Sequence, residues 1–551
     1  MISPESCSCI VSAGLRSEAG VTGYWDGARS CSGLLLDRQR GLVLCHAQIL
    51  SPFLRQQQQL SRQPFLLPGA FHRDLQIQVQ FRARTSPGGG RTEPRSEPLS
   101  ESPSPDLNPE VPASGLVRSQ GYGPATFLVA FPCLEFREAF QSLYHEADQW
   151  HFSLDDQEAA LEDLAWFGLL QCPSWARGSQ GGESLQYVSS ELLRKGQTLF
   201  SCASPFASFW SEVFMNTFSK GIVSNLAGER NAVILTDARC LPGTEGGGIY
   251  LKLHGLYYLA GLIAAPLCWK AHEWVGLTLV CSITCIFKAI RRIWNALDKN
   301  GKSVSFCPMS GHLPLPSSRW QGVLTQLFGV VALLESDGVW GSGVVISPRL
   351  ILTCRHVLGR ASAVEVKIQP DSGSCLASKG RVLFATKDNS AYDVALVELE
   401  KDLLYVEVPV AASAFNTGED VCVIAYGVFG QSCGPSVTAG VLSAVITVDQ
   451  QPAMLQTTCA VHAGTSGGPV FRTSSGELLG IVSSNTRNNS AGACYPHLNF
   501  SLPITVLQPL LSRYKQTRDA AVFEELNQVN DRMCALWRPQ DGFLITPKSK
   551  L

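Results

Sequence analysis

The sequence predicts an all-β protein built from several small β-barrels. One observation is that apolar runs of strand length are separated by turn residues. For example, Val344-Val345-Ile346 and Leu350–Thr353 flank a Ser-Pro turn. A second observation is that the landmarks around these runs occur twice along the chain. At 551 residues the chain is long enough to bury two or more cores.

Three polar residues of the carboxy-terminal half stand in an ordered set. His356 follows an apolar strand, Asp393 opens the apolar run 394–397, and Ser466 lies in a glycine-rich turn. The order His, Asp, Ser occurs in one class of serine peptidases. A buried Asp393 can fix the tautomer of His356 and stabilise its imidazolium when Ser466 gives up its proton. Each residue alone could be structural, but the ordered set favours nucleophilic catalysis.

The glycines around Ser466 predict a tight turn. Gly464, Gly467 and Gly468 allow backbone angles that other residues rarely adopt. We expect the N–H groups of Gly464 and Ser466 to converge on an oxyanion, where they would stabilise the charge that develops during acyl transfer.

Residues from about 323 to 513 resemble the trypsin-like fold in its Deg/HtrA version. The shared motifs are Gly-Ser-Gly-Val at 341–344, Thr-Cys-Arg-His-Val at 353–357, Tyr-Asp-Val-Ala-Leu at 392–396 and Gly-Thr-Ser-Gly-Gly-Pro at 464–469. The resemblance implies a double β-barrel in which Ala460, six residues before the nucleophile, forms the base of the P1 specificity pocket. It also implies that Ser483 supports the buried aspartate and borders the substrate. An uncharged base favours a small or apolar P1 residue.

The amino-terminal half predicts a degenerate copy of this domain. Its Ser32–Ala47 region parallels 342–356, with Ala47 at the place of the histidine. In the same comparison Asp163 parallels the aspartate and Glu245 replaces the nucleophilic serine. Without His or Ser this half cannot perform acyl transfer. A wholly unrelated domain is the alternative.

These features give a domain organisation along the chain. We expect a degenerate trypsin-like domain at 1–300 and a linker at 301–322. A catalytic domain at 323–515 and a C-terminal helix and tail at 516–551 follow. The insertion 84–118 is rich in Pro, Ser, Gly, Arg and Glu and is expected to be disordered. The 36 residues after 515 are too few for the C-terminal peptide-binding domain common in Deg/HtrA proteins.

Composition and the two chain ends predict the compartment and the partners. A net charge of −2 offers no general attraction to nucleic acid, and no apolar run is long enough for a membrane span. The amino end lacks a secretory signal, whereas Ser549-Lys550-Leu551 matches the C-terminal peroxisomal address. We therefore expect a protein of the peroxisomal matrix that binds the import receptor for this tripeptide. The 19 cysteines fit free, buried thiols, and no metal site or cofactor is predicted.

Taken whole, the chain resembles the family of peroxisomal processing proteases related to the plant glyoxysomal processing protease. The resemblance rests on the repeat, the single complete triad and the Ser-Lys-Leu end. It implies removal of N-terminal leaders from imported matrix precursors, processing of fatty-acid β-oxidation enzymes and self-cleavage. We also expect a homo-oligomer. The alternatives are an HtrA-like general quality-control protease of the peroxisome and a module that binds precursors without cutting them.

Overall fold

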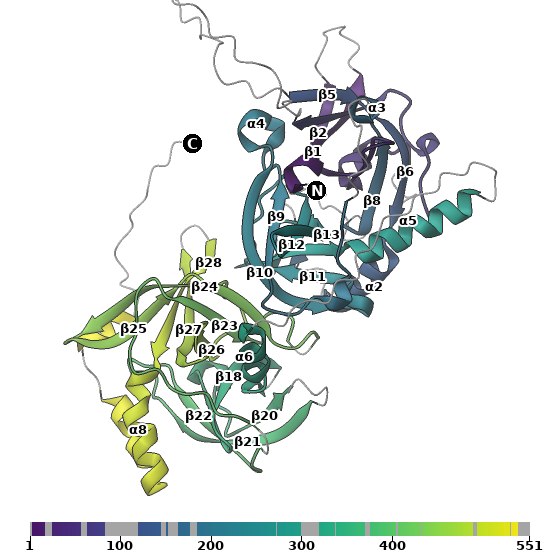
Figure 1. Cartoon of the computed structure of the whole chain (residues 1–551). Coiled ribbons are helices and arrows are strands. Elements are labelled where there is room, and N and C mark those ends of the chain that lie inside the picture. The colour runs from purple at the N-terminus through teal and green to yellow at the C-terminus, as the bar shows by residue number, and fades with distance from the viewer. Residues whose placement is uncertain are drawn as a thin grey trace, which may run out of the picture.

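The protein is mostly β and consists of two halves that lie side by side. Figure 1 shows the amino-terminal half in purple to teal and the carboxy-terminal half in green to yellow. The computed structural model describes residues 3–16, 25–56, 63–82, 120–144, 150–152, 164–176, 185–270, 273–298, 319–336, 338–369, 375–403, 406–430, 432–488, 493–528 and 531–537. The insertion predicted at 84–118 and the tripeptide 549–551 lie outside these residues, as does most of the linker.

The carboxy-terminal half contains two closed six-stranded barrels, which confirms the predicted double-barrel fold. The first runs in the order β17-β18-β19-β22-β21-β20, with strands Val331–Ser336, Val339–Ser347, Leu350–Thr353, Ala395–Leu399, Leu376–Ala385 and Ala363–Ile368. The second runs β23-β24-β25-β28-β27-β26, with strands Asp420–Ala425, Ser436–Val448, Gln451–Thr457, Ala493–Pro503, Leu478–Asn488 and Pro469–Arg472. The central strand β19 is buried along its whole length, as expected for the continuous apolar run Leu350–Thr353.

The amino-terminal half repeats this topology strand for strand in its second barrel. That closed barrel runs β9-β10-β11-β16-β13-β12, with strands Thr198–Ala203, Thr217–Ala227, Val233–Thr236, Thr278–Ser282, Leu256–Ala265 and Gly248–Leu253. The preceding sheet runs β5-β4-β1-β2-β3-β8-β6, with strands Gln120–Pro124, Leu75–Arg82, Ser8–Arg16, Trp25–Asp37, Leu42–His46, Trp166–Gln171 and Thr126–Pro132. The repeat read from the sequence is therefore confirmed at the level of the fold.

The seven-stranded sheet corresponds to a six-stranded barrel whose fifth strand is broken. Its two edge strands, β5 and β6, are consecutive in the chain and are separated only by Ala125. β5 pairs with β4, and β6 pairs with β8. In the carboxy-terminal half the single strand β21 makes both equivalent pairings, with β20 and β22. Pro124 has no N–H to donate to a ladder, and the chain breaks after it. The two short strands β5 and β6 therefore share the pairings that β21 makes alone.

The halves share apolar core rather than touching only at polar surfaces. Phe429 of the carboxy-terminal half is 5% exposed and belongs to the core of the amino-terminal half. Its ring stacks on Trp150, with centroids 5.6 Å apart, and meets Tyr144 edge-on at 5.5 Å. Polar contacts continue the interface along β10 and β24: Asn225 Nδ2 donates to Ser436 Oγ at 2.8 Å. Contacts of this kind fix the orientation of one half relative to the other.

Helices occupy the periphery of the barrels and the end of the chain. They are α1 Pro4–Cys7, α2 Leu134–Leu143, α3 Pro173–Ala176, α4 Ala207–Phe214, α5 Ile283–Asp298, α6 Arg319–Phe328, α7 Arg355–Leu358, α8 Ile504–Thr517 and α9 Asp531–Trp537. α6 begins at Arg319, inside the segment predicted as linker. Within the described ranges, no helix is both long and apolar enough to cross a bilayer.

Most cysteines are buried inside these barrels. The cysteines whose side chains the structure places are free thiols, and all of them except Cys375 and Cys433 are buried. Burial disfavours the charged thiolate and raises the pKa of several, such as Cys202 and Cys459, the latter to about 12. These thiols act as small apolar core residues rather than as reactive groups.

Candidate active site

The predicted triad residues come together at one cleft between the two carboxy-terminal barrels. His356 lies on the short helix α7 directly after β19, and Asp393 precedes β22 in the same barrel. Ser466 belongs to the second barrel, in the turn before β26. All three line a cleft of about 550 Å³. Because β19 and β22 are neighbouring antiparallel strands, the end of one and the start of the other bring His356 and Asp393 together.

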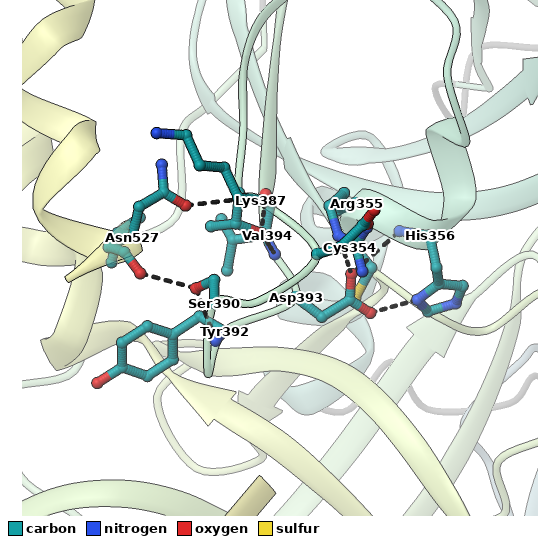
Figure 2. Close-up of polar contacts among 12 residues, drawn as sticks. Cys354, Arg355, His356, Lys387, Ser390, Tyr392, Asp393, Val394 and Asn527 are labelled. Carbon is teal, nitrogen blue, oxygen red and sulfur yellow. Dashed lines mark hydrogen bonds and ion pairs between the residues drawn. The ribbon is translucent and has the colours of Figure 1, made fainter. Parts of the chain in front are cut away.

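The contacts between Asp393 and His356 fix the imidazole. His356 Nδ1 donates to Asp393 Oδ2, and the His356 backbone N–H donates to Asp393 Oδ1 at 3.0 Å. Figure 2 shows the carboxylate facing the ring. Burial by itself raises the pKa of Asp393, but the hydrogen bonds from His356, the charge on His356 and that on Arg355 together hold it below its ordinary value. In the neutral imidazole the Nδ1 proton faces the ionised Asp393, so Nε2 is the nitrogen that can take a proton.

The loop that carries Asp393 is held from behind by the C-terminal segment. The 3-10 segment η8, Ala520–Asn527, lies against this loop. Asn527 Oδ1 accepts from the Lys387 N–H at 2.8 Å, and the Leu526 carbonyl accepts from Ser390 Oγ at 2.7 Å (Figure 2). Ser390 Oγ in turn accepts from the Tyr392 N–H at 3.0 Å. The chain beyond the second barrel therefore supports the carboxylate side of the site.

The turn around Ser466 has the backbone geometry that its glycines predict. Gly464 and Gly467 have φ of +87° and +81°, which other residues rarely adopt. A Cβ on Gly467 would lie 2.1 Å from the Ser342 carbonyl oxygen, so the turn also packs too closely for any side chain there. Ser342 Oγ donates to the Gly464 carbonyl at 2.9 Å, and Thr465 Oγ1 donates to the His462 carbonyl at 2.6 Å. These bonds fix the turn without an ion pair at position 465.

Among the described residues, neither the Gly464 N–H nor the Ser466 N–H donates a hydrogen bond to the protein. Both groups are thus available to an oxyanion. Ser466 and His356 both line the cleft. Among the described residues, no hydrogen bond joins their two side chains. Such bonds are often long before substrate binds.

The two residues predicted for the specificity pocket lie at different depths. Ser483 lines the cleft beside Ser466, at a bulge of β27 between Val482 and Ser484. Ala460 is 1% exposed and is not one of the cleft-lining residues, whereas its neighbour Val461 is. Its assignment as the pocket base stays a prediction.

His462 lines the cleft as a neutral residue. Burial lowers its pKa to about 4. Its Nδ1 accepts from the Val428 N–H at 3.3 Å, and its ring fills the space that a Cβ on Gly427 would occupy. A neutral, packed imidazole of this kind shapes the wall of the cleft and adds no charge to it.

Cys354, His356 and Asp393 also place possible metal-ligand atoms within 4.8 Å of one another. However, Cys354 Sγ donates to the Val482 carbonyl at 3.2 Å, and burial raises the pKa of this thiol well above its ordinary value. A metal needs a thiolate. We therefore interpret Cys354 as a buried support for the His-Asp pair.

The equivalent site in the amino-terminal half lacks the histidine, the aspartate and the serine of the triad. Strand register corrects two of the equivalences assigned from the sequence. Gly343 pairs with Thr353, and its counterpart Gly33 pairs with Cys45, so Cys45 is equivalent to Thr353. His356 lies three residues after Thr353, and its equivalent is therefore Gln48 rather than Ala47. Pairing of β3 with β8 places Trp166, buried at 1% exposure, where the catalytic half has Asp393. Asp163, the residue assigned from the sequence, lies outside the described residues.

Glu245 occupies the nucleophile position, as predicted. The flanking Gly243 and Gly246 keep φ of +92° and +78°, so the turn persists. The Gly243 N–H, equivalent to that of Gly464, donates to Glu245 Oε2 at 2.8 Å. The carboxylate thus occupies the donor that an oxyanion would use.

Two of the cleft residues that the sequence did not predict come from outside the two catalytic barrels. Glu273 comes from the amino-terminal half, and Trp537 ends α9 beyond the second barrel. No local motif marks either residue, because both reach the cleft by packing between distant segments.

Comparison with known proteins identifies the family of the chain. The trypsin-like peptidase domain model matches residues 341–481. The peroxisomal leader peptide-processing proteases of Mus musculus and Homo sapiens are each 43% identical over 573 aligned residues. These alignments cover 99% and 100% of this chain and 98% and 99% of those proteins. A solved serine endoprotease from Yersinia pestis is 23% identical over 37% of this chain and 69% of its own, with a TM-score of 0.30. With two relatives aligned over nearly its whole length, the chain belongs to the family of peroxisomal leader peptide-processing proteases.

Proposed function

We propose that this peroxisomal serine endopeptidase removes N-terminal leader peptides from precursors imported into the matrix, using Ser466 as its nucleophile. The observation that carries the proposal is the meeting of His356, Asp393 and Ser466 at one cleft, beside two N–H groups available to an oxyanion. The printed names of the mouse and human relatives support the choice of leader peptides as substrate.

The geometry supports an acyl-transfer mechanism. His356 Nε2 takes the proton from Ser466 Oγ as the oxygen attacks the scissile carbonyl, and the N–H groups of Gly464 and Ser466 bind the oxyanion. His356 then protonates the leaving amine, which departs as the new amino terminus. Water, deprotonated by His356, hydrolyses the acyl-enzyme and releases the leader. Asp393 holds the imidazole in the required tautomer throughout.

Further parts of the proposal rest on the sequence and on the family resemblance. They are processing of fatty-acid β-oxidation enzymes, self-cleavage, assembly as a homo-oligomer, and import by the receptor that binds Ser549-Lys550-Leu551. We also propose that residues 323–515 form the catalytic unit and 1–300 a degenerate one. Glu245 and Trp166 at two triad-equivalent positions support the second assignment.

Cleavage of a leader-bearing precursor by the full chain tests the function. The wild-type protein should release one defined leader and an intact mature protein, both identified by mass spectrometry. Ser466→Ala should abolish this cleavage and labelling by a serine-reactive fluorophosphonate. Ser474→Ala, which changes an exposed serine in the same barrel, should retain both. Labelling that survives in Ser466→Ala would contradict the assignment, and general digestion of the mature protein would favour a quality-control role.

A further inference from the structure

The turn that carries Gly464, which we call the Gly464 turn, packs on the loop that joins β23 to β24, residues 426–435. A Cβ on Gly464 would lie 2.9 Å from the Gly427 carbonyl oxygen, so the two backbones are in close contact. The Val428 N–H donates to His462 Nδ1 at 3.3 Å, two residues before Gly464. The start of the β23–β24 loop is therefore fixed beside one of the two proposed oxyanion donors.

The rest of the same loop is buried against the amino-terminal half. Phe429 is 5% exposed, and its ring stacks on that of Trp150. Further along the loop, Lys195 Nζ donates to the Cys433 carbonyl at 3.0 Å and to the Pro435 carbonyl at 2.8 Å. Apolar and polar contacts thus anchor the β23–β24 loop to the degenerate half.

Trp150 belongs to a small sheet of the amino-terminal half. Its order is β15-β14-β7, with strands Glu273–Trp274, Trp269–Lys270 and Trp150–His151. Lys270 pairs with Trp150 across the sheet. On the outer strand, the Trp274 ring meets the His497 ring of the catalytic half edge-on, with centroids 5.7 Å apart, and β15 packs against β28. The sheet that carries Trp150 is therefore itself fixed on the second catalytic barrel.

Lys270 connects this sheet to the Gly464 turn. Its Nζ lies 5.5 Å from the centroid of the Trp150 ring and 5.5 Å from that of the Trp340 ring, within range of both. Trp340 Nε1 donates to the Gly427 carbonyl at 3.0 Å and would lie 2.8 Å from a Cβ on Gly464. A second series of contacts therefore runs from Trp150 to the Gly464 turn, in addition to the β23–β24 loop.

The Gly464 turn needs support from its surroundings. An oxyanion donor is effective when its position is fixed before the reaction. However, Gly464 has φ +87° and no side chain that could pack. Within the catalytic half, Ser342 Oγ donates to the Gly464 carbonyl at 2.9 Å. The turn also meets the β23–β24 loop and Trp340, and both of these contact the amino-terminal half.

We propose that Phe429 is a positioning residue for the protease reaction, through which the amino-terminal half keeps the N–H of Gly464 in place for the oxyanion. The inference rests on the proposed function, because it assigns a support to that active site. Phe429 is not among the described residues that line the cleft, so it acts through the β23–β24 loop. The degenerate half has then lost its own chemistry and serves as part of the scaffold of the active site.

Steady-state kinetics on one peptide, together with the rate of fluorophosphonate labelling of Ser466, tests this proposal. Phe429→Ala in the full chain should lower kcat and the labelling rate about tenfold with little change in KM, because a displaced donor weakens the transition state more than substrate binding. Phe429→Leu, which keeps a large apolar side chain, should recover most of the loss. Phe71→Ala removes a buried ring from the same core that packs on Phe127 instead, and should retain wild-type kcat.

Lys195→Met is a second test that leaves the apolar core intact. It removes the donor to the Cys433 and Pro435 carbonyls and keeps the aliphatic stem, so kcat should fall about threefold at constant KM. Lys252→Met, its control, removes a lysine of the same half whose Nζ lies over the Tyr257 ring, and should leave kcat unchanged. Thermal unfolding should first show that each variant is folded at the assay temperature.

The outcomes separate the two proposals. If folded Phe429→Ala and Lys195→Met retain wild-type kcat, the positioning role is wrong while the protease assignment stands. It is also wrong if Phe71→Ala loses as much kcat as Phe429→Ala, since the effect then reflects general destabilisation. A rise in KM at constant kcat would place the β23–β24 loop in substrate binding instead. If wild-type protein cuts no peptide and Ser466 is not labelled, the proposed function fails first.

Discussion

Asp237 and Ala439 join the two halves of the protein through one hydrogen bond. Asp237 Oδ2 accepts from the Ala439 N–H at 2.7 Å, while Oδ1 accepts from Ile222 N–H within its own half, also at 2.7 Å. The carboxylate is buried and bridges β10 and β24, the strands along which the halves meet. One side chain therefore satisfies a backbone donor on each side of the interface.

Removal of this bridge should loosen the interface. In Asp237→Ala both N–H groups lose their acceptor, at a cost of about 1–3 kcal/mol for each buried donor left unpaired. Hydrogen exchange measured by mass spectrometry should be faster in peptides that contain Ala439 and Ile222. Asp402→Ala, which removes an exposed carboxylate of the catalytic half, is the control. Unchanged exchange at Ala439 in Asp237→Ala would show that this bond does not hold the halves together.

Glu245 should make the amino-terminal half less stable as the pH rises from acidic to neutral. Burial raises the pKa of Glu245 from its ordinary 4.5 to about 7. The folded state therefore keeps this proton to a higher pH than the unfolded chain. Its contribution to the free energy of unfolding falls as pH rises from 4.5 to 7 and is constant above that.

Glu245→Gln keeps an acceptor for the Gly243 N–H and removes the titration. The variant should therefore be more stable than wild type by roughly 3 kcal/mol at pH 8 and nearly equal to it at pH 4.5. Urea unfolding of the full chain at both pH values, with Glu365→Gln as the exposed control, measures the difference. Peptide cleavage should be unchanged. Equal stability gains at pH 4.5 and pH 8 would count against the buried, titrating carboxylate.

The sequence alone predicted the site residues that depend on short local patterns. His356, Asp393 and Ser466 each stand beside an apolar strand or a glycine turn, and those elements alone place them at strand ends facing one cleft. The glycines at 464 and 467 were predictable for the same reason, since positive φ is a property of the local backbone.

Residues fixed by register or by packing between halves could not be predicted in this way. The sequence comparison aligned Cys45 with Cys354 because both are cysteines, and it therefore placed the histidine equivalent one residue too early. The ladder between β2 and β3 pairs Cys45 with Gly33 and makes Gln48 the histidine equivalent. Glu273 reaches the cleft only because Trp274 and Gly276 pack on the catalytic barrel. Neither relationship leaves a motif in the chain.

Asn527 should act as a positioning residue for Asp393. Asn527→Ala removes the acceptor for the Lys387 N–H and loosens the loop that carries the carboxylate. Because a misplaced carboxylate weakens the transition state more than substrate binding, kcat should fall about 3- to 10-fold with little change in KM. Steady-state kinetics on one peptide measures this split. Asn416→Ala, an exposed asparagine in the second barrel, should retain wild-type kcat. A rise in KM with constant kcat would instead place Asn527 in substrate binding.

Import should depend on the last residue of the chain. The receptor-read tripeptide Ser549-Lys550-Leu551 functions only at a free C-terminus, so deletion of Leu551 should leave the protein in the cytosol. Fractionation of cells that lack any intact copy measures the distribution, because an intact copy could carry the truncated one into the organelle. Lys548→Ala, just outside the tripeptide, should still reach peroxisomes. Peroxisomal recovery of the truncated protein would reveal a second address.

The P1 residue should be small or apolar. Val461, the neutral His462 and Ala463 line the cleft together with Ser466, and the adjacent Ala460 is buried. A cationic P1 side chain would lose its hydration there without meeting a carboxylate, which costs several kcal/mol in desolvation alone, or about a hundredfold or more in kcat/KM.

A peptide series that varies only P1 measures this preference, with Cys and Ala expected to be cut much faster than Arg and Lys. Since His462 stays neutral above its pKa of about 4, the P1 profile should be the same at pH 6 and pH 8. Ala460→Asp should raise kcat/KM for Arg relative to Cys, and Ala460→Ser, nearly as small and uncharged, should not. Because Gly276 leaves little room above Ala460, thermal unfolding should first show that both variants are folded. A wild-type preference for Arg at P1 would overturn the uncharged pocket and leave the triad assignment intact.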